Sequence, residues 1–400
     1  MVANLRGGPG VQLKSKRQPG KGAFVKRHAT VVTGVILCAV LGSALPASAS
    51  TTWRVQPVPK PPNSTARLDG VSCPAFGDCI AVGFSGDKTT GAHHTLAERW
   101  TGGAWAIQPT PTPTGQGDFV GVSCLSATDC TAFGDAGVGP LVEHWDGTNW
   151  TVQPSPSPPV GATSVGLVGG SCTSPTSCTA VGLYDLSGGK GERPFAAYWN
   201  GSTWTDQQVP MPAGARLADL DGGVSCSSAT RCIAVGAYAL KTEPGARPFA
   251  ARWNGTGWIA RAVPMPAGAT GGFLDGVSCT SPSHCTAVGD YDNAAGTAVP
   301  PFAARWNGIT WTVQAVNAPD GGGLDAVSCT SGTSCTAVGS LSSTGLAEHW
   351  DGTSWTVQPT PVPNHGTATY ADLLGVSCLS AAYCTAVGLY NRAQPLADHQ

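Results

Sequence analysis

Fourteen of the fifteen cysteines form seven pairs with the spacing Cys-x5-Cys, and the first cysteines of successive pairs are 48 to 54 residues apart. The pairs are 73/79, 124/130, 172/178, 226/232, 279/285, 329/335 and 378/384. A spacing that recurs every fifty residues or so is typical of a repeat architecture, in which each unit buries its apolar surface against its neighbours. The 400 residues therefore predict one repeat fold and not a chain of two or three unrelated domains.

Tryptophans follow the same period. Six pairs have the spacing Trp-x4-Trp, and one more tryptophan, Trp53, stands alone near the start. The pairs are 100/105, 145/150, 199/204, 253/258, 306/311 and 350/355. Each repeat contains four short runs rich in Val, Thr and Trp, separated by Gly, Pro, Asn and Asp, which predict four strands, A to D in chain order. Four antiparallel strands in a unit of this length are typical of a β-propeller blade.

The two ends of the chain share one repeat. The last repeat reads through strand C at Pro395–Gln400, and residues 52–57 read as an isolated strand D. Pairing of these segments predicts an all-β fold, a seven-bladed β-propeller of four-stranded antiparallel blades whose ring is closed by the N-terminal strand on the C-terminal blade. The predicted blades span about 68–110, 119–156, 165–210, 221–264, 273–316, 323–360, and 373–400 completed by 52–59.

The cysteine spacing also predicts disulfides. A hairpin with five residues between two cysteines places them opposite each other on strands A and B, within reach of a disulfide bond. Zinc sites need shorter ligand spacings and a second ligand pair nearby, which this sequence lacks. A row of reduced, buried cysteines is the alternative. The predicted disulfide cysteines are Cys73, Cys79, Cys124, Cys130, Cys172, Cys178, Cys226, Cys232, Cys279, Cys285, Cys329, Cys335, Cys378 and Cys384.

Residues 1–49 have the pattern of a secretory signal peptide. A basic stretch from Lys14 to Arg27 precedes an apolar run from Ala29 to Leu45, and residues 47–49 have the small-x-small pattern of a cleavage site. We predict cleavage and export, with an uncleaved membrane anchor as the alternative. Residues 50–400 then carry 15 basic and 24 acidic side chains, a net charge of −9 that argues against nucleic acid and anionic lipid as partners.

The predicted C–D turn carries a further motif, Asp351-Gly352-Thr353-Ser354-Trp355. With the Cys and Trp periods, this motif makes residues 51–400 resemble bacterial propellers of the sialidase type, built from Asp-box (BNR) repeats, and of the kelch type. The chain is most similar to Cys- and Trp-rich propeller proteins exported by actinobacteria. The motif keeps the Asp, Gly and Trp of an Asp-box, but it lacks the leading Ser, and Gly follows Asp directly. The resemblance implies a propeller fold and an extracellular location, and it implies no catalytic residue.

The predicted loops fall on two faces. The A–B and C–D loops are nearly uniform between repeats, whereas the B–C and D–A loops vary in length and composition, so we expect the ligand site on the second face. Aromatic rings beside mixed charges suit sugars or peptides. Ordinary solvated loop residues, with tyrosines packed at strand ends, are the alternative. The predicted ligand-binding residues are Tyr184, Asp185, Arg193, Asp221, Tyr238, Arg247, Tyr291 and Asp292.

Catalytic and metal-binding patterns are weaker. Asp219/Asp221 and Asp290/Asp292 are candidates for the paired carboxylates of a glycosidase, and His93-His94 lacks a third metal ligand at a telling distance. We therefore predict no catalytic residue, no metal and no cofactor. The expected function is that of a secreted, monomeric binding scaffold for polysaccharide or a cell-surface protein. A carbohydrate-active hydrolase or lyase and a structural envelope component are the alternatives.

Overall fold

The computed structural model describes residues 52–112, 115–186, 191–241, 243, 245–293, 299–318, 322–341, 344–391 and 394–400, except the side chains of residues 364 and 365. The predicted signal peptide lies outside these ranges, as do parts of the predicted B–C loops, at residues 187–190, 242, 244 and 294–298. Within the described ranges, no helix is long and apolar enough to cross a membrane.

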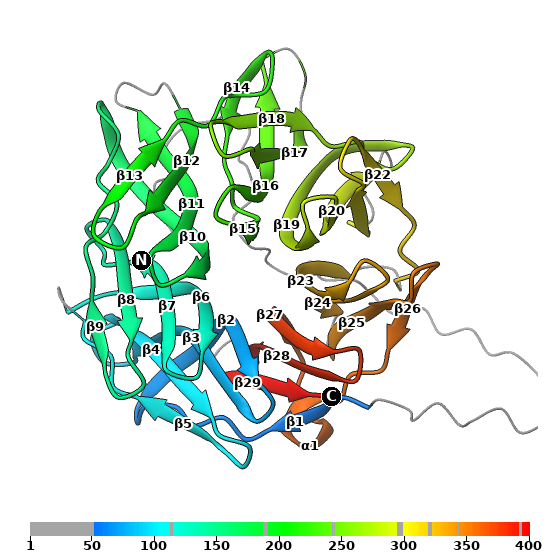
Figure 1. Cartoon of the computed structure of the whole chain (residues 1–400). Coiled ribbons are helices and arrows are strands. Elements are labelled where there is room, and N and C mark those ends of the chain that lie inside the picture. Colours follow the sequence, from blue (N-terminus) through cyan, green and yellow to red (C-terminus); the bar gives the residue numbers. More distant parts are fainter. Residues whose placement is uncertain are drawn as a thin grey trace, which may run out of the picture.

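Four-stranded antiparallel sheets repeat along the chain, as predicted, and stand around a common centre (Figure 1). We number the repeats 1 to 7 and keep the names A to D for their strands, with strand A innermost. Repeats 1 to 3 comprise β2 (Ser64–Ala75), β3 (Asp78–Asp87), β4 (His93–Trp100), β5 (Trp105–Gln108); β6 (Asp118–Ser126), β7 (Asp129–Asp135), β8 (Pro140–Trp145), β9 (Trp150–Val152); and β10 (Ala162–Ser174), β11 (Ser177–Leu186), β12 (Gly191–Trp199), β13 (Trp204–Gln207).

The later repeats follow the same plan, with strand A of repeat 4 broken into β14 and β15. Repeats 4 and 5 comprise β14 (Ala215–Ala218), β15 (Val224–Ser228), β16 (Arg231–Leu240), β17 (Ala246–Trp253), β18 (Trp258–Ala262); and β19 (Ala269–Ser281), β20 (His284–Asn293), β21 (Pro301–Trp306), β22 (Trp311–Gln314). Repeats 6 and 7 comprise β23 (Gly323–Ser331), β24 (Ser334–Leu341), β25 (Thr344–Trp350), β26 (Trp355–Gln358); and β27 (Ala371–Ser380), β28 (Tyr383–Tyr390), β29 (Gln394–His399) with β1 (Arg54–Gln56).

The two ends of the described chain meet in repeat 7. Strand β1 pairs antiparallel with β29, with Val55 opposite Asp398. Repeats 6 and 7 belong to one eight-stranded sheet, because a single residue pair, Ser340 and Asp372, joins β24 to β27. The propeller therefore has six or seven blades, according to whether this sheet counts once or twice. A four-residue helix, α1 (Pro363–Gly366), lies between the two repeats and was not predicted.

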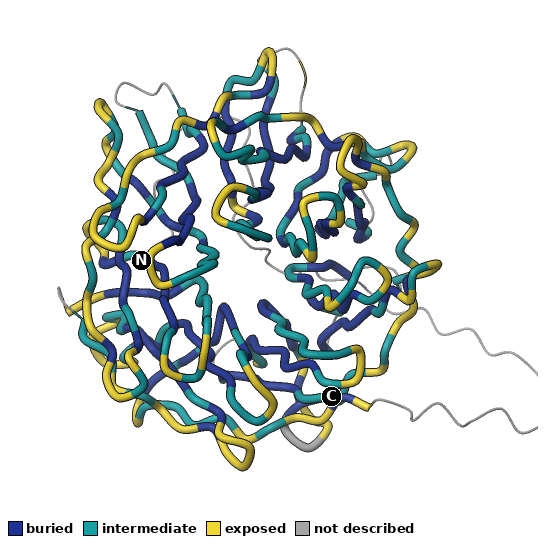
Figure 2. Tube along the Cα trace, in the orientation of Figure 1, coloured by how far each residue is buried: buried dark blue, intermediate teal, exposed yellow. Residues whose placement is uncertain are grey.

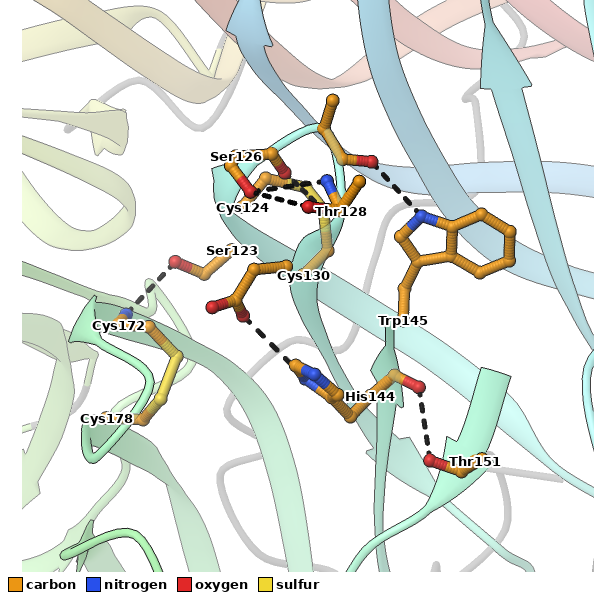
Figure 3. A network of polar contacts seen from close by, with 12 residues as sticks. Ser123, Cys124, Ser126, Thr128, Cys130, His144, Trp145, Thr151, Cys172 and Cys178 are labelled. Atoms are coloured by element: carbon orange, nitrogen blue, oxygen red, sulfur yellow. Dashed lines mark hydrogen bonds and ion pairs between the residues drawn. A yellow bond between two sulfur atoms is a disulfide. The ribbon is translucent and has the colours of Figure 1, made fainter. Parts of the chain in front are cut away.

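Each A–B hairpin is closed by a disulfide, which confirms the seven predicted pairs. Figure 3 shows two of them, Cys124–Cys130 and Cys172–Cys178. The paired Cα atoms are 3.9–4.1 Å apart. The C–D turn is equally regular. In repeat 2 the Asp146 carboxylate accepts hydrogen bonds from the amides of Thr148 and Asn149, and Gly147 has a positive φ of 95°. These two hairpins make the A–B and C–D face uniform.

Strand B contains a glycine where strand A bulges toward it. A Cβ atom at this position would lie 1.9–2.3 Å from a backbone oxygen of strand A, so no side chain fits. The seven positions are Gly83, Gly134, Gly182, Gly236, Gly289, Gly339 and Gly388. This close approach explains why strand B has a glycine at this position in every repeat. The residue before the glycine is a valine in six repeats and Phe133 in repeat 2.

Hydrogen bonds between repeats line the centre. The serine before the first cysteine of each repeat accepts a hydrogen bond from the amide of the first cysteine of the next, as Ser123 does from Cys172 (Figure 3). The donor–acceptor distances are 3.0–3.1 Å. The amide and hydroxyl pairs are Cys124/Ser72, Cys172/Ser123, Cys226/Ser171, Cys279/Ser225, Cys329/Ser278, Cys378/Ser328 and Cys73/Ser377. The last pair joins repeat 7 to repeat 1.

The core lies between neighbouring repeats and is richest on strands B and C. Buried residues are dark blue in Figure 2. Small residues fill the inner strands, and the tryptophans of strands C and D fill the wider outer gap. Three strand-D tryptophans also donate to a glutamine of the preceding repeat: Trp258 to Gln207, Trp355 to Gln314, and Trp53 to Gln358. Packing and hydrogen bonding therefore both run from repeat to repeat.

Candidate functional site

The B–C and D–A connections form the variable face, called here the loop face. The predicted tyrosines stand at the loop-face end of strand B in repeats 3 to 5. Tyr238 is only 7% exposed and packs edge-on against Phe249, with 6.0 Å between ring centroids. Tyr291 packs in the same way on Phe302 at 6.1 Å, and Tyr184 is half-buried. Tyr238 therefore contributes to the core, and the rings of Tyr184 and Tyr291 keep more surface toward solvent.

The two predicted arginines lie directly opposite two of these tyrosines. Arg193 pairs with Tyr184 across β12 and β11, and Arg247 pairs with Tyr238 across β17 and β16. The Arg193 guanidinium donates to the carbonyl oxygens of Glu192 (2.8 Å) and Arg216 (3.0 Å). The Arg247 guanidinium donates to the Glu243 carboxylate. Arg193 thereby connects repeat 3 to strand A of repeat 4.

Carboxylates gather where repeats 3 and 4 meet on the loop face. Glu192 lies opposite Asp185 in the β11–β12 ladder. Burial raises the pKa of Glu192, and the Asp185 and Asp221 carboxylates raise it further, whereas Arg216 lowers it. We call Asp185, Glu192, Asp219 and Asp221, with Arg193 and Arg216, the repeat 3–4 cluster. Asp185, Arg193 and Asp221 were predicted from the sequence as site residues, and Glu192 was not. Its position next to Arg193 places Glu192 opposite Asp185 in the β11–β12 hairpin.

Asp219 has a structural position within this cluster. Its side chain is buried, and its Oδ1 accepts hydrogen bonds from the amides of Ala237 (3.2 Å) and Asp221 (3.4 Å). Burial, and then the neighbouring Asp221 carboxylate, hold the pKa of Asp219 well above its ordinary value. Asp219 follows directly after β14, at the point where strand A breaks. The Asp219 carboxylate accepts the hydrogen bond of the Ala237 amide, in place of the backbone acceptor that an unbroken strand A would provide. Asp221 is exposed.

Replacement of Asp219 is expected to destabilise the protein more than replacement of Asp221. In Asp219→Ala the buried amide of Ala237 loses its acceptor, which costs about 1–3 kcal/mol of unfolding free energy. Asp221→Ala removes an exposed side chain, so we expect a change within about 0.5 kcal/mol. Urea unfolding of both variants measures the difference. Equal losses would show that the Asp219 carboxylate does not support the strand break.

A second polar group lies on the loop face at repeats 1 and 2. His93 Nδ1 is 3.1 Å from Asp118 Oδ1, and its ring stacks on Phe84 with 4.4 Å between centroids. The Arg67 guanidinium lies 4.8 Å from the centroid of Phe84 and pairs with Asp69 at 2.9 Å. The described residues contain no group of three or more His, Cys, Asp or Glu side chains arranged to hold a metal ion. The sequence analysis considered His93 only as a metal ligand and missed Phe84 and Asp118.

Of the remaining predicted residues, Tyr238 lies opposite Ala218 of β14, next to the repeat 3–4 cluster, and Tyr291 and Asp292 lie on β20 of repeat 5. Asp290 and Asp292 are two residues apart on β20, so their side chains lie on the same face of that strand. Asp292 lies opposite Gly271. Two small hollows, each with room for about one water molecule (about 10 Å³), lie between repeats 4 and 5 and include none of the predicted ligand residues. Their lining includes Arg252, Cys285 and Trp306.

Comparisons with known proteins add the fold class. No protein-family model matches the sequence, and no curated protein matches it. The solved structure "YCF48 bound to D1 peptide" is 13% identical, with a TM-score of 0.56 over 88% of this chain and 96% of that one. YCF48 from Cyanidioschyzon merolae is also 13% identical, with a TM-score of 0.54 over 87% and 99%. A PL25 polysaccharide lyase, an ulvan lyase, is 9% identical, with a TM-score of 0.51 over 84% and 93%.

These neighbours are β-propellers, and at such identities the likeness shows the fold alone. The chain is thus a repeat β-propeller protein. Its particular activity has to be argued from its own residues.

Proposed function

We propose that the protein is a secreted, non-enzymatic binding protein that holds a carbohydrate on its loop face. The repeat 3–4 cluster carries this proposal, because it brings the Asp185, Glu192 and Asp221 carboxylates together with Arg193 beside the half-buried ring of Tyr184. Carboxylates and guanidinium groups hydrogen-bond adjacent sugar hydroxyls, and an aromatic ring packs on the apolar face of a sugar. The proposed contact residues are Tyr184, Asp185, Arg193, Asp221, Tyr291 and Asp292 together with Glu192, and Tyr238 and Arg247 support them.

The proposal includes a particular architecture and location. We infer seven blades in a ring that β1 closes on β29, and the Cys73–Ser377 hydrogen bond between repeats 7 and 1 supports this inference. Seven disulfides and no membrane-spanning helix among the described residues fit an extracellular protein. Removal of residues 1–49 and a monomeric state in solution complete the proposal.

A carbohydrate-active enzyme is the second candidate, favoured by one observation. Glycosidases and related enzymes pair a carboxylic acid that burial keeps neutral with a second, ionised carboxylate. Glu192 has a pKa raised by burial and by Asp185 and Asp221, as the acid of such a pair requires. One structural neighbour acts on a polysaccharide. In this reading Glu192 is the acid, and Asp185 or Asp221 is its partner.

Retention and release of polysaccharide distinguish the two candidates. The purified protein is applied to a panel of insoluble polysaccharides and cell-wall fractions, while bound protein and soluble sugar fragments are measured together. Retention without release supports the binding protein, and release supports the enzyme. If the protein is neither retained nor active on any fraction, the carbohydrate proposal is wrong and a protein partner or an envelope role takes its place.

Charge removal in the repeat 3–4 cluster is expected to weaken binding without loss of stability. The variant Glu192→Gln/Asp221→Asn keeps side-chain size and removes two acceptors of charge-assisted hydrogen bonds, so the Kd for a retained oligosaccharide should rise about tenfold or more. Asp206→Asn, on strand D of repeat 3, is the matched control and should leave the Kd unchanged. Calorimetric titration measures both. An unchanged Kd in the double variant would remove this cluster from the site.

A further inference from the structure

One strand-C position differs between the two halves of the propeller. In repeats 1 to 6 it lies two residues before the strand-C tryptophan, in repeat 7 it lies two residues before Gln400, and in every repeat it faces an alanine of strand B. Repeats 1, 2 and 6 have Glu98, Glu143 and Glu348 there, and repeat 7 has Asp398. Repeats 3, 4 and 5 have an alanine at the same position: Ala197, Ala251 and Ala304. Repeats 6, 7, 1 and 2 form one continuous arc in Figure 1.

These four carboxyl groups are buried, and at least one oxygen of each has no hydrogen-bond partner among the described residues. Glu98, Glu143 and Glu348 are 0% exposed and Asp398 is 1% exposed. Within the part of the chain that the structure describes, neither oxygen of the three glutamates has a hydrogen-bond partner, and Oδ1 of Asp398 has none. A buried, ionised carboxylate without a partner is strongly unfavourable, so such a group takes up a proton instead.

Each of the four side chains points into the gap between two repeats. Side chains two apart on a strand share a face, so Glu98 faces the same way as Leu96 and Trp100. Those two residues pack against Val387 and Ala397 of repeat 7. By the same alternation Glu143 faces repeat 1, Glu348 faces repeat 5, and Asp398 faces repeat 6. The four groups therefore occupy four consecutive gaps between repeats.

A branched apolar side chain stands on the solvent side of each carboxyl. The cross-strand partners on strand D are Ile107 opposite Glu98, Val152 opposite Glu143, Val357 opposite Glu348, and Val55 opposite Asp398. All four are partly exposed, and cross-strand partners share a face of the sheet. The strand-D residue thus covers the carboxyl at the outer rim, and the alanine of strand B closes the gap from inside.

Charged groups on the surrounding strands are engaged elsewhere. Arg99 pairs with Asp78 at 2.7 Å, Arg67 with Asp69 at 2.9 Å, and His144 with Asp129 at 3.8 Å. The Arg305 guanidinium donates to the carbonyl of Gly332, and His399 Nδ1 is 2.9 Å from the Thr385 hydroxyl. The other titratable side chains on the strands of repeats 1, 2, 5, 6 and 7 are Arg54, Asp87, His93, His94, Asp118, Asp135, Asp275, His284, Asp290, Tyr291, Asp292, Asp325, His349, Asp372, Tyr383 and Tyr390.

The pH at which the four groups ionise follows from their burial. Burial raises the pKa of Glu98 and of Glu143 to about 8, and it raises the pKa of Glu348 and of Asp398 to about 7. In the unfolded chain these groups ionise near their ordinary values, so the folded state binds more protons from about pH 4 upward. The contribution of these four groups to stability is therefore greatest in acid, and it falls as the pH rises to about 8. Above that pH, the folded chain holds four buried charges.

We propose that repeats 6, 7, 1 and 2 form a pH-sensitive half of the propeller, in which ionisation of Glu98, Glu143, Glu348 and Asp398 separates neighbouring repeats and releases strand β1. Repeats 3 to 5, which carry the repeat 3–4 cluster, have alanines at this position and stay closed. Strand β1 leaves first, because it has three residues and its Val55 lies directly on Asp398. The inference holds whether or not the loop face binds carbohydrate.

Hydrogen–deuterium exchange of the purified protein tests this. Protection factors, corrected for the pH dependence of intrinsic exchange, are compared at pH 6 and pH 9.5. We expect a fall of about 100-fold for β4 and β8, and of about tenfold for residues 52–58, β25 and β29. Between pH 6 and pH 9.5, each pH unit by which the folded pKa exceeds 6 corresponds to a factor of about ten, and that excess is about two units for Glu98 and Glu143 and about one unit for Glu348 and Asp398. Strands β12, β17 and β21 should change by less than about threefold. Equal loss in all seven repeats, or no loss at pH 9.5, would overturn the proposal.

Two sets of variants assign the effect to the four carboxyls. The quadruple variant Glu98→Gln/Glu143→Gln/Glu348→Gln/Asp398→Asn should show no excess loss of protection at pH 9.5 in the sensitive half, and a persisting loss would contradict the proposal. If this variant does not fold, Asp398→Asn alone should keep β1 protected at pH 9.5. In the converse test, Ala304→Glu should extend the alkaline loss of protection to β21. The exposed Asp206→Asn should have the wild-type profile.

Discussion

Full reduction of the seven disulfides is expected to unfold the protein at 25 °C. Each bond closes a hairpin with a sequence separation of six residues, so the chain-entropy estimate is about 2 kcal/mol per disulfide. Seven such terms sum to about 15 kcal/mol, which reaches the upper end of the net stability of an ordinary domain. The second cysteine of each pair is also buried. Reduction replaces each disulfide by two thiols, whose sulfur atoms need more space in the same packed gap.

Thermal unfolding followed by circular dichroism, with and without reductant, measures this effect. Titration of fourteen thiols under denaturing conditions verifies that reduction is complete. The matched partial variant is Cys172→Ala/Cys178→Ala, which removes one bond and should lower the unfolding free energy by about 2 kcal/mol. A fully reduced protein that keeps its Tm would show that packing between repeats suffices, and that the disulfides protect the chain against something other than unfolding.

The repeat plan could be predicted from the sequence because the period appears in residues that face each other across one hairpin. Cys172 lies opposite Cys178, and Trp199 lies opposite Trp204, so a local spacing directly gives the strand register. The four strands of each repeat could also be predicted locally, from short runs rich in Val, Thr and Trp separated by Gly, Pro, Asn and Asp. Strand A extends further than predicted, to Ser64 in repeat 1, because its early residues pair with the end of strand B without any Cys or Trp to mark them.

Contacts between repeats could not be predicted in this way. Ser123 accepts from the amide of Cys172, 49 residues away, and this contact depends on how two sheets pack. The burial of Glu98 likewise depends on residues of repeat 7. The local sequence Glu98-Arg99 has two neighbouring charged residues, which by themselves indicate an exposed strand. Tyr238 was assigned to a ligand site from its loop position, whereas Phe249 and its neighbours bury its ring.

The candidate site was predictable only as far as its residues lie on one hairpin. Asp185 and Arg193 were found from one variable loop, and the hairpin register then places Glu192 opposite Asp185. Their proximity to Asp221 and Arg216 arises from the packing of repeat 4 against repeat 3 and has no local signal. Likewise, His93 and Asp118 are 25 residues apart and meet only because repeat 2 packs on repeat 1.

Replacement of Trp53 is expected to destabilise the protein strongly and to detach strand β1 from β29. The side chain is 4% exposed and packs with Val338, Ala347 and Leu396. Its indole N–H also donates to Gln358 Oε1 of repeat 6 at 3.1 Å. Truncation of a buried tryptophan to alanine costs about 3–5 kcal/mol of unfolding free energy. Because β1 is only three residues long, this loss should detach the strand from β29.

Trp105→Ala is the matched control, since Trp105 begins strand D of repeat 1 and is equally buried. Urea unfolding should show a similar loss for both variants, because both remove the same side chain from the same kind of gap. Hydrogen exchange should separate them: Trp53→Ala exposes the amides of β1 and of β29 while repeats 2 to 5 remain protected. Trp105→Ala should leave β1 protected, because β5 remains covalently continuous with β4 through a short turn. Equal protection of β1 in both variants would show that the pairing of the two chain ends does not depend on Trp53, and that strand hydrogen bonds alone hold repeat 7 together.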